Sequence, residues 1–133
     1  MARAKVIAMM KRKAGVTPEE FRNYYEGTHA PLAMKHFSEF FADYRRNYPS
    51  MEFLVDNDTS GNALKGPAQR TQTGETTYDV ITEFWYHDKQ AMDAMFAKFG
   101  EVNDIFVVDE AEFIDRDTLR VFIVEESASD MGG

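Results

Sequence analysis

The residue best suited to acid–base chemistry is His29, which lies near the end of a segment with clear helix signals. Imidazole titrates near neutral pH, so histidine is the usual general acid or base. Thr17 and Glu20 form a capping box at the start of the segment. Pro31 predicts its end, because proline lacks a backbone donor and restricts the preceding residue. We therefore expect His29 in the last turn, one turn after Tyr25, and take both as candidate catalytic residues.

A second group of candidates lies on the segment 78–86, whose alternating pattern is typical of a strand. Asp79, Glu83 and Trp85 share one face. The two carboxylates lie about 13 Å apart along the strand, too far to share a proton. In a cavity, one of them would have a raised pKa and could act as an acid or base. The alternative is ion pairing with arginines of neighbouring strands. Asp79 is the expected catalytic partner of His29, and Glu83 and Trp85 are expected to bind substrate.

The remaining candidates are tyrosine, histidine and arginine side chains near the same elements. Tyrosine hydroxyls can hydrogen-bond a phenol or carboxylate, and arginine can pair with a carboxylate. Each could equally be a core aromatic or a partner of a nearby acid. The further substrate-binding residues that we expect are Tyr24, His36, Tyr44, Arg45 and Tyr48.

The sequence contains no metal or cofactor motif that we recognise. Three dispersed histidines and no cysteine give no ligand spacing for a metal. Phosphate-binding glycine loops, serine elbows and dinucleotide fingerprints are also missing from the sequence. We therefore expect chemistry that needs no cofactor.

The elements that must position these groups follow from periodicity and from turn residues. We expect strands over 5–12, 41–48, 78–86 and 118–126, and helices over 17–31, 88–99 and 102–114. Gly100 is expected to end the second of these helices, and 32–40 forms either a short helix or an irregular arm. In the second strand, Phe41 is expected on the face of Asp43 and Arg45.

Two segments lack a sustained pattern. Residues 49–77 are expected to be an inserted loop with an ordered start and a flexible middle, since loops of this length are uncommon in a compact domain. Residues 51–55 could extend the second strand into a hairpin or dock onto a neighbour. Residues 127–133 are expected to be a flexible tail.

This order of elements predicts an α+β fold of the ferredoxin-like type, β-α-β-β-α-β, as a single domain over residues 1–126. Its four-stranded antiparallel sheet would carry helices on one face only. The other face is mixed and aromatic, so we expect a second copy of the chain to cover it. Two facing sheets would enclose a barrel-like cavity.

Composition narrows the possible partners. The chain has 133 residues and a net charge of −8, which argues against binding to nucleic acid or to an anionic membrane. No apolar run approaches the length of a membrane span or a signal peptide, so we expect the homodimer to be located in the cytoplasm. Eleven Phe, six Tyr and one Trp indicate either a phenylalanine-rich core or a pocket for a flat, apolar ligand.

Several motifs resemble those of EthD-domain proteins, in the dimeric α/β-barrel superfamily. The similar segments in the first half are Lys11-Arg12-Lys13, Thr17-Pro18-Glu19-Glu20-Phe21, Tyr24-Tyr25 and His29-Ala30-Pro31. Those in the second half are Tyr78-Asp79, Glu83-Phe84-Trp85, and the segments 109–115 and 120–126. The resemblance covers most of the chain outside 49–77 and the tail. It implies the barrel fold and strengthens the case for His29, but it implies no particular reaction.

The resemblance and the candidate residues together suggest a cofactor-independent lyase, a decarboxylase or dehydratase acting on an aromatic or phenolic compound. His29 would move the proton. Three alternatives stay open at this point. A lactone isomerase or polyketide cyclase would use the same groups, a haem- or oxygen-dependent monooxygenase belongs to the same superfamily, and an accessory or ligand-binding dimer would need no catalysis.

Overall fold

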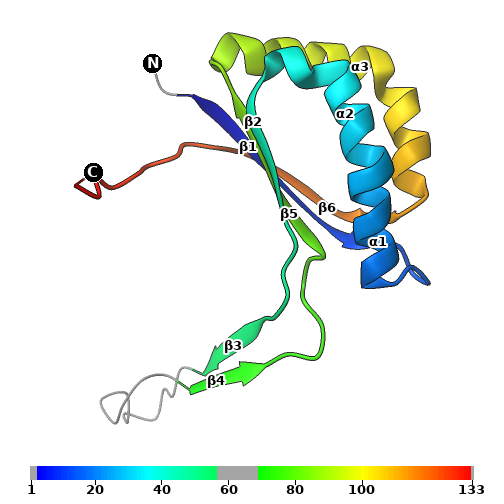
Figure 1. Ribbon diagram of the computed structural model, residues 1–133, viewed down its shortest axis with the longest axis vertical. Helices are drawn as coiled ribbons and strands as arrows, with labels where there is room; N and C mark the ends of the chain where they lie inside the picture. Colours follow the sequence, from blue (N-terminus) through cyan, green and yellow to red (C-terminus); the bar gives the residue numbers. More distant parts are fainter. Residues whose placement is uncertain (1–2, 57–68, 133) are drawn as a thin grey trace.

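The computed structural model describes residues 3–56 and 69–132. Its centre is an antiparallel sheet of four strands, in the order β2-β5-β1-β6. The strands are β1 (Ala4–Arg12), β2 (Phe41–Asn47), β5 (Val80–Tyr86) and β6 (Ile114–Val124). The helices cover one face of this sheet (Figure 1). The order and the one-sided helices confirm the predicted ferredoxin-like α+β fold.

The first helical region is longer than predicted, because the chain remains helical through Pro31. It consists of α1 (Pro18–Tyr24), a π-helical turn η1 (Tyr25–His29), α2 (Ala30–Phe37) and a 3₁₀ turn η2 (Ser38–Phe40). The predicted capping box is present at its start, with Thr17 and Glu20 bonded to each other's backbone amides. The predicted end was wrong for a physical reason. In the wider π turn the Ala30 amide bonds to the Tyr25 carbonyl, and Pro31 falls in the first turn of α2, where no donor is needed.

The second helical region is one continuous helix, α3 (Lys89–Ala111), so the predicted break at Gly100 was also wrong. Asp88 caps its start by accepting from the Ala91 amide at 2.8 Å. A glycine inside a helix costs about 1 kcal/mol relative to alanine. Burial of Met92, Met95 and Phe106 on both sides of Gly100 outweighs that cost.

Gly100→Ala should stabilise the protein. Gly100 is exposed, and a Cβ added there meets nothing within 4 Å. The free energy of unfolding, measured by urea denaturation, should rise by about 0.5–1 kcal/mol. Gly15→Ala is the control, because Gly15 has φ +86° and a side chain there is strained. Equal effects from the two substitutions would contradict this account.

The core lies between the helices and the sheet, as the alternation of β5 predicts. Val80, Thr82 and Tyr86 of that strand are fully buried under the helices. One detail of β2 was predicted wrongly. A β-bulge between Phe41 and Asp43 shifts the register, so that Phe41 packs into the core rather than lying with Asp43.

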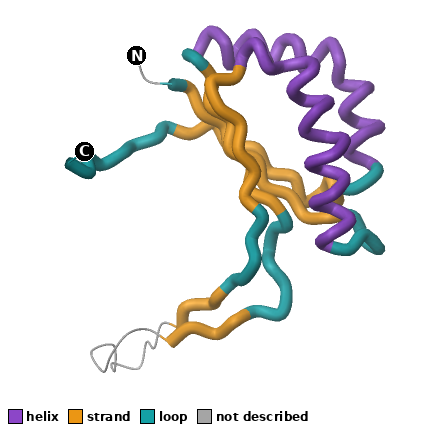
Figure 2. The backbone as a smooth tube through the Cα atoms, in the orientation of Figure 1, coloured by secondary structure: helices purple, strands orange, loops and turns teal. Residues whose placement is uncertain are grey.

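The segment after β2 forms a two-stranded hairpin that projects away from the main sheet (Figure 2). Its strands are β3 (Phe53–Asp56) and β4 (Gln69–Gln72). The predicted ordered start of the 49–77 insertion contributes the first strand of this hairpin, and the predicted flexible middle lies outside the described residues. After β6, the described residues 125–132 form neither helix nor strand. In the part of the chain that the structure describes, none of the helices has the length and apolarity needed to cross a membrane.

Candidate functional site

His29 is buried at the end of η1 and is held there by a carboxylate of α3. Its Nδ1 lies 2.5 Å from Oδ2 of Asp109, and the Tyr24 hydroxyl donates to Oδ1 of the same side chain at 2.9 Å. Burial and this hydrogen bond raise the pKa of Tyr24 to about 12, so it stays a donor. As a carboxylate, Asp109 only accepts, so we assign the proton to Nδ1 of His29. The Nε2 lone pair is then the one available to a ligand.

Aromatic rings fix the orientation of the His29 imidazole. Its ring centroid lies 4.7 Å from that of Tyr25 and 5.2 Å from that of Phe113. Tyr25 is itself held by a 2.8 Å hydrogen bond to the Thr82 hydroxyl of β5. Burial raises the pKa of Tyr25, so its hydroxyl stays protonated. The histidine is thus fixed through one nitrogen and by packing against two aromatic rings, which suits a pre-organised proton-transfer group.

A cavity of about 190 Å³ lies beside His29, between the helices and the sheet. Its wall is mainly aliphatic and aromatic and includes Val6, Ala8, Met10, Phe37, Phe99 and Phe106. The polar side chains on the wall are Tyr25, His29, Tyr86 and Glu110. The Tyr86 hydroxyl is buried without a hydrogen-bond partner among the described residues. No lysine or arginine is among the described residues that line the cavity.

Glu110 is the acidic group of this cavity and is only 8% exposed. Burial raises the pKa of its carboxyl above the ordinary value of 4.5. Arg116 opposes that rise, because its Nε lies 3.3 Å from Oε1 of Glu110. The arginine is half exposed, so its charge is screened by water.

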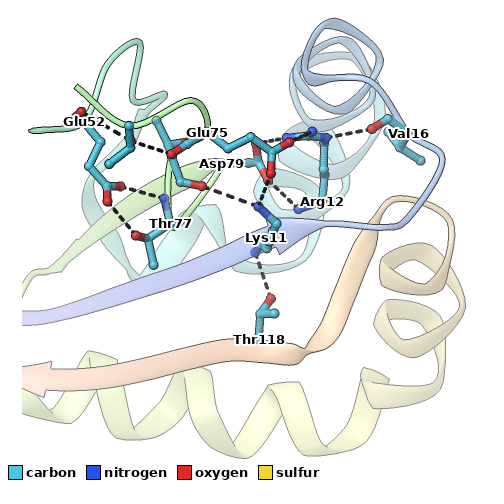
Figure 3. Close-up of polar contacts among 10 residues, drawn as sticks. Lys11, Arg12, Val16, Glu52, Glu75, Thr77, Asp79 and Thr118 are labelled. Carbon is cyan, nitrogen blue, oxygen red and sulfur yellow. Dashed lines mark hydrogen bonds and ion pairs between the residues drawn. The ribbon is translucent and has the colours of Figure 1, made fainter. Parts of the chain in front are cut away.

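Asp79, the expected catalytic partner, lies in a different polar cluster (Figure 3). Its two oxygens accept from the Arg12 guanidinium and the Arg12 backbone amide, each at 2.8 Å. Arg12 also bonds to Glu75 and to the Val16 carbonyl. The structure therefore places Asp79 in a structural ion pair that joins β1 to the start of β5, and it does not bring Asp79 and His29 into one cavity.

Glu83, Trp85 and Arg45 lie on the opposite face of the sheet from the helices. Lys5 binds Glu83 at 2.9 Å, and its Nζ lies 4.2 Å from the Trp85 ring centroid. Trp85 donates to Glu126 at 2.8 Å, and Arg45 is exposed and bonded to Asp43. The alternation of β5 placed Glu83 and Trp85 on this face correctly, but His29 faces the other side of the sheet.

The other predicted binding residues surround the site without lining its cavity. Tyr48 donates to Glu26 at 2.6 Å, and Arg46 lowers the pKa of that carboxyl to about 2. Tyr44 stacks on Phe84 with ring centroids 4.9 Å apart. His36 packs its ring 5.8 Å from that of Phe106. Tyr24 contacts His29 only indirectly, through its hydrogen bond to Asp109.

Known proteins resemble this chain in sequence and in fold. Residues 13–117 match the sequence model of the EthD domain. The chain belongs to the EthD family. The resemblance seen in the sequence motifs is thereby confirmed. No protein of curated function matches the chain significantly.

Solved structures show the same fold at low sequence identity. An EthD-family protein of Bacillus halodurans is 19% identical with a TM-score of 0.58, and the match covers 95% of this chain and all of that one. An EthD-like protein of Ralstonia eutropha is 17% identical with a TM-score of 0.54 and coverages of 96% and 97%. A protein of Arabidopsis thaliana is 17% identical with a TM-score of 0.53 and coverages of 96% and 99%. These similarities establish the fold alone. The activity must be argued from the residues of the site.

Two functional candidates of this EthD-family protein were missed in the sequence, Asp109 and Glu110. A signal was present, because the apolar stripe expected over 102–114 passes through Val102, Phe106 and Phe113, and Asp109 falls on it. An acidic residue on the buried stripe of a helix needs a partner. Among the described residues of this EthD chain, no group of three or more His, Cys, Asp or Glu side chains is arranged to hold a metal ion.

Proposed function

We propose that this EthD-family protein is a cofactor-independent lyase, of the decarboxylase or dehydratase type, that acts on a small aromatic or phenolic compound. The observation that carries the proposal is the pairing of His29 Nδ1 with Asp109 at the wall of an apolar cavity. The pairing leaves Nε2 as the proton acceptor. A histidine oriented by a buried carboxylate is a recurrent general base, and the carboxylate stabilises the imidazolium that forms.

The size and lining of the cavity support a small aromatic substrate. A cavity of about 150 Å³ in an unrelated protein holds benzene, and this cavity measures about 190 Å³. It therefore suits one ring with a small substituent. The aromatic wall offers edge-to-face contacts, and the few polar groups would orient the bound molecule.

Two of the alternative functions fit this cavity to different degrees. Isomerisation of a lactone and cyclisation of a small polyketide need the same base and the same apolar wall, so they remain the second candidate function. A haem-dependent monooxygenase fits less well, because the cavity is smaller than the roughly 300–1,000 Å³ of ordinary ligand pockets.

The homodimer is also part of the proposal. The sheet face opposite the helices carries the Lys5, Glu83 and Trp85 cluster and the half-exposed Phe122. A second copy would cover these groups. The cavity beside His29 lies on the other side of the sheet and is formed within one chain, so catalysis does not require residues of the second copy.

The test is turnover by the wild-type protein and by His29→Asn on a panel of small hydroxylated aromatic acids and cyclic β-hydroxy ketones. Release of carbon dioxide and ultraviolet absorbance report decarboxylation and loss of water. Asparagine can still donate to Asp109 and lacks the nitrogen at the Nε2 position, so the site should stay folded. We expect turnover without added metal or cofactor, and a loss of about 10²–10⁴-fold in the variant.

His87→Gln is the matched control, because His87 is exposed at the end of β5. It should leave the rate unchanged. An accessory protein predicts a different result, in which His29→Asn retains full biological activity. That result would end the catalytic proposal.

A further inference from the structure

Glu110 gives the cavity an acid as well as a base. We propose that Glu110 is a second catalytic residue, which donates its proton to an uncharged substrate and makes dehydration, rather than decarboxylation, the favoured reaction. This inference rests on the proposed function of His29 and deepens it. It is carried by the position of Glu110 on the same cavity wall and by the charges around it.

Helix α3 presents two consecutive acids to the site in different roles. Asp109 bonds to His29 and Tyr24, which occupy its two oxygens. Glu110 lines the cavity, and its contact with the Arg116 Nε is 3.3 Å long. Arg116, His29 and Asp109 are the charged or titratable groups that act on it. From the sheet, the cavity wall is apolar near β1 and β6, with Met10, Leu119 and Val121.

This distribution of charge disfavours an anionic substrate. A carboxylate in the cavity would lose its hydration and meet no lysine or arginine among the described lining residues. A buried charge without a partner is costly. An alcohol or ketone carries no such cost. Burial keeps the Glu110 carboxyl protonated to higher pH, which suits it to donate to such a group.

The step balances with these two residues. His29 Nε2 takes a proton from the carbon next to the one that bears the hydroxyl. The electron pair of that C–H bond forms the new double bond, the C–O bond breaks, and the leaving oxygen takes the Glu110 proton and departs as water. His29 is then protonated and Glu110 ionised. Transfer of the proton from His29 to Glu110 through water restores both residues once the product has left.

The first test follows the Glu110 carboxyl by ¹³C NMR in protein labelled at glutamate. We expect one carboxyl that titrates above the ordinary range, that disappears in Glu110→Gln, and that remains in the control Glu101→Gln, on an exposed position of α3. Arg116→Gln should move its midpoint further up, because the guanidinium favours the ionised form. A Glu110 carboxyl that titrates in the ordinary range would overturn the proposal.

The same titration has a consequence for stability. A carboxyl whose pKa is higher in the folded than in the unfolded protein contributes stability below the unfolded value, and this contribution is lost as the pH rises through the folded value. The wild type should therefore lose stability over that interval relative to Glu110→Gln. Parallel pH profiles of the two proteins would overturn the proposal, even if Glu110→Gln were less stable throughout.

The second test uses benzyl alcohol and benzoate as probes of equal size and different charge. At pH 7 we expect the alcohol to bind more tightly by at least about tenfold, measured by ligand-observed NMR, because the anion must bury an unpaired charge. Equal or tighter binding of benzoate would overturn the inference, even where His29→Asn abolishes turnover. If the panel yields no turnover while Glu110 titrates high and the alcohol is preferred, the catalytic function fails and the site for a neutral ligand stands.

Discussion

Asp109→Asn is expected to lower turnover by about 10²–10⁴-fold, the range typical of general acid–base catalysis, while the protein stays folded. The reason is the hydrogen bond from Tyr24. Its hydroxyl donates to Oδ1 of Asp109 at 2.9 Å, so it selects the carbonyl oxygen of the new amide. The amide nitrogen then faces Nδ1 of His29 and donates to it. Nδ1 becomes an acceptor, the proton moves to Nε2, and the base in the cavity is lost.

The tautomer can be read directly from the ¹⁵N shifts of His29, independently of any substrate. In the wild type we expect the proton on Nδ1, and in Asp109→Asn on Nε2. In the double variant Asp109→Asn with Tyr24→Phe, the side-chain amide can rotate by about 180°, because the tyrosine hydroxyl no longer fixes its orientation. Part of the activity and of the original His29 tautomer should then return. Tyr24→Phe alone is the control and should have a smaller effect than Asp109→Asn. An unchanged tautomer in Asp109→Asn would refute this reading of the pair.

The second large effect is expected from Phe113→Ala, which should lower the free energy of unfolding by about 3–5 kcal/mol. Phe113 follows α3 and is 1% exposed. Its ring lies 4.6 Å from that of Tyr24, 5.4 Å from that of Phe21 and 5.2 Å from that of His29. The Phe113 ring therefore joins the end of α3 to α1 and η1. Its removal leaves a void that the surrounding side chains, held by their own contacts, cannot fill.

Urea denaturation measures this change in the free energy of unfolding directly. The change is a large fraction of the total, because native proteins are typically stable by about 5–15 kcal/mol. Phe53→Ala is the matched control. Phe53 is 48% exposed on the β3–β4 hairpin, so its truncation should change stability by no more than about 0.5 kcal/mol. If Phe113→Ala were as mild as Phe53→Ala, packing of Phe113 between α3, α1 and η1 would not be a main source of stability.

Each error in predicting the fold has an identifiable physical cause. Pro31 and Gly100 are reliable signals of helix ends, and both lie inside helical structure here. The π turn before Pro31 removes the need for its missing donor, and packing of α3 outweighs the cost of Gly100. Phe41 was placed on the wrong face because a bulge changes the alternation of β2. At Gly100 and Phe41 a contact distant in sequence overrode a local preference, whereas at Pro31 the local π turn did so.

The sequence by itself determined the order of elements, the capping box at Thr17, the two faces of β5 and the position of His29 one turn after Tyr25, because these depend on neighbours within a few residues. Only the tertiary structure decided which acid serves the histidine. Asp79 was the expected partner, but Arg12 binds it, and Asp109, 80 residues along the chain from His29, takes its place. Packing of the helices on the sheet brings α3 against η1. The periodicity of the sequence does not show whether this packing buries Asp79 or Asp109 beside His29.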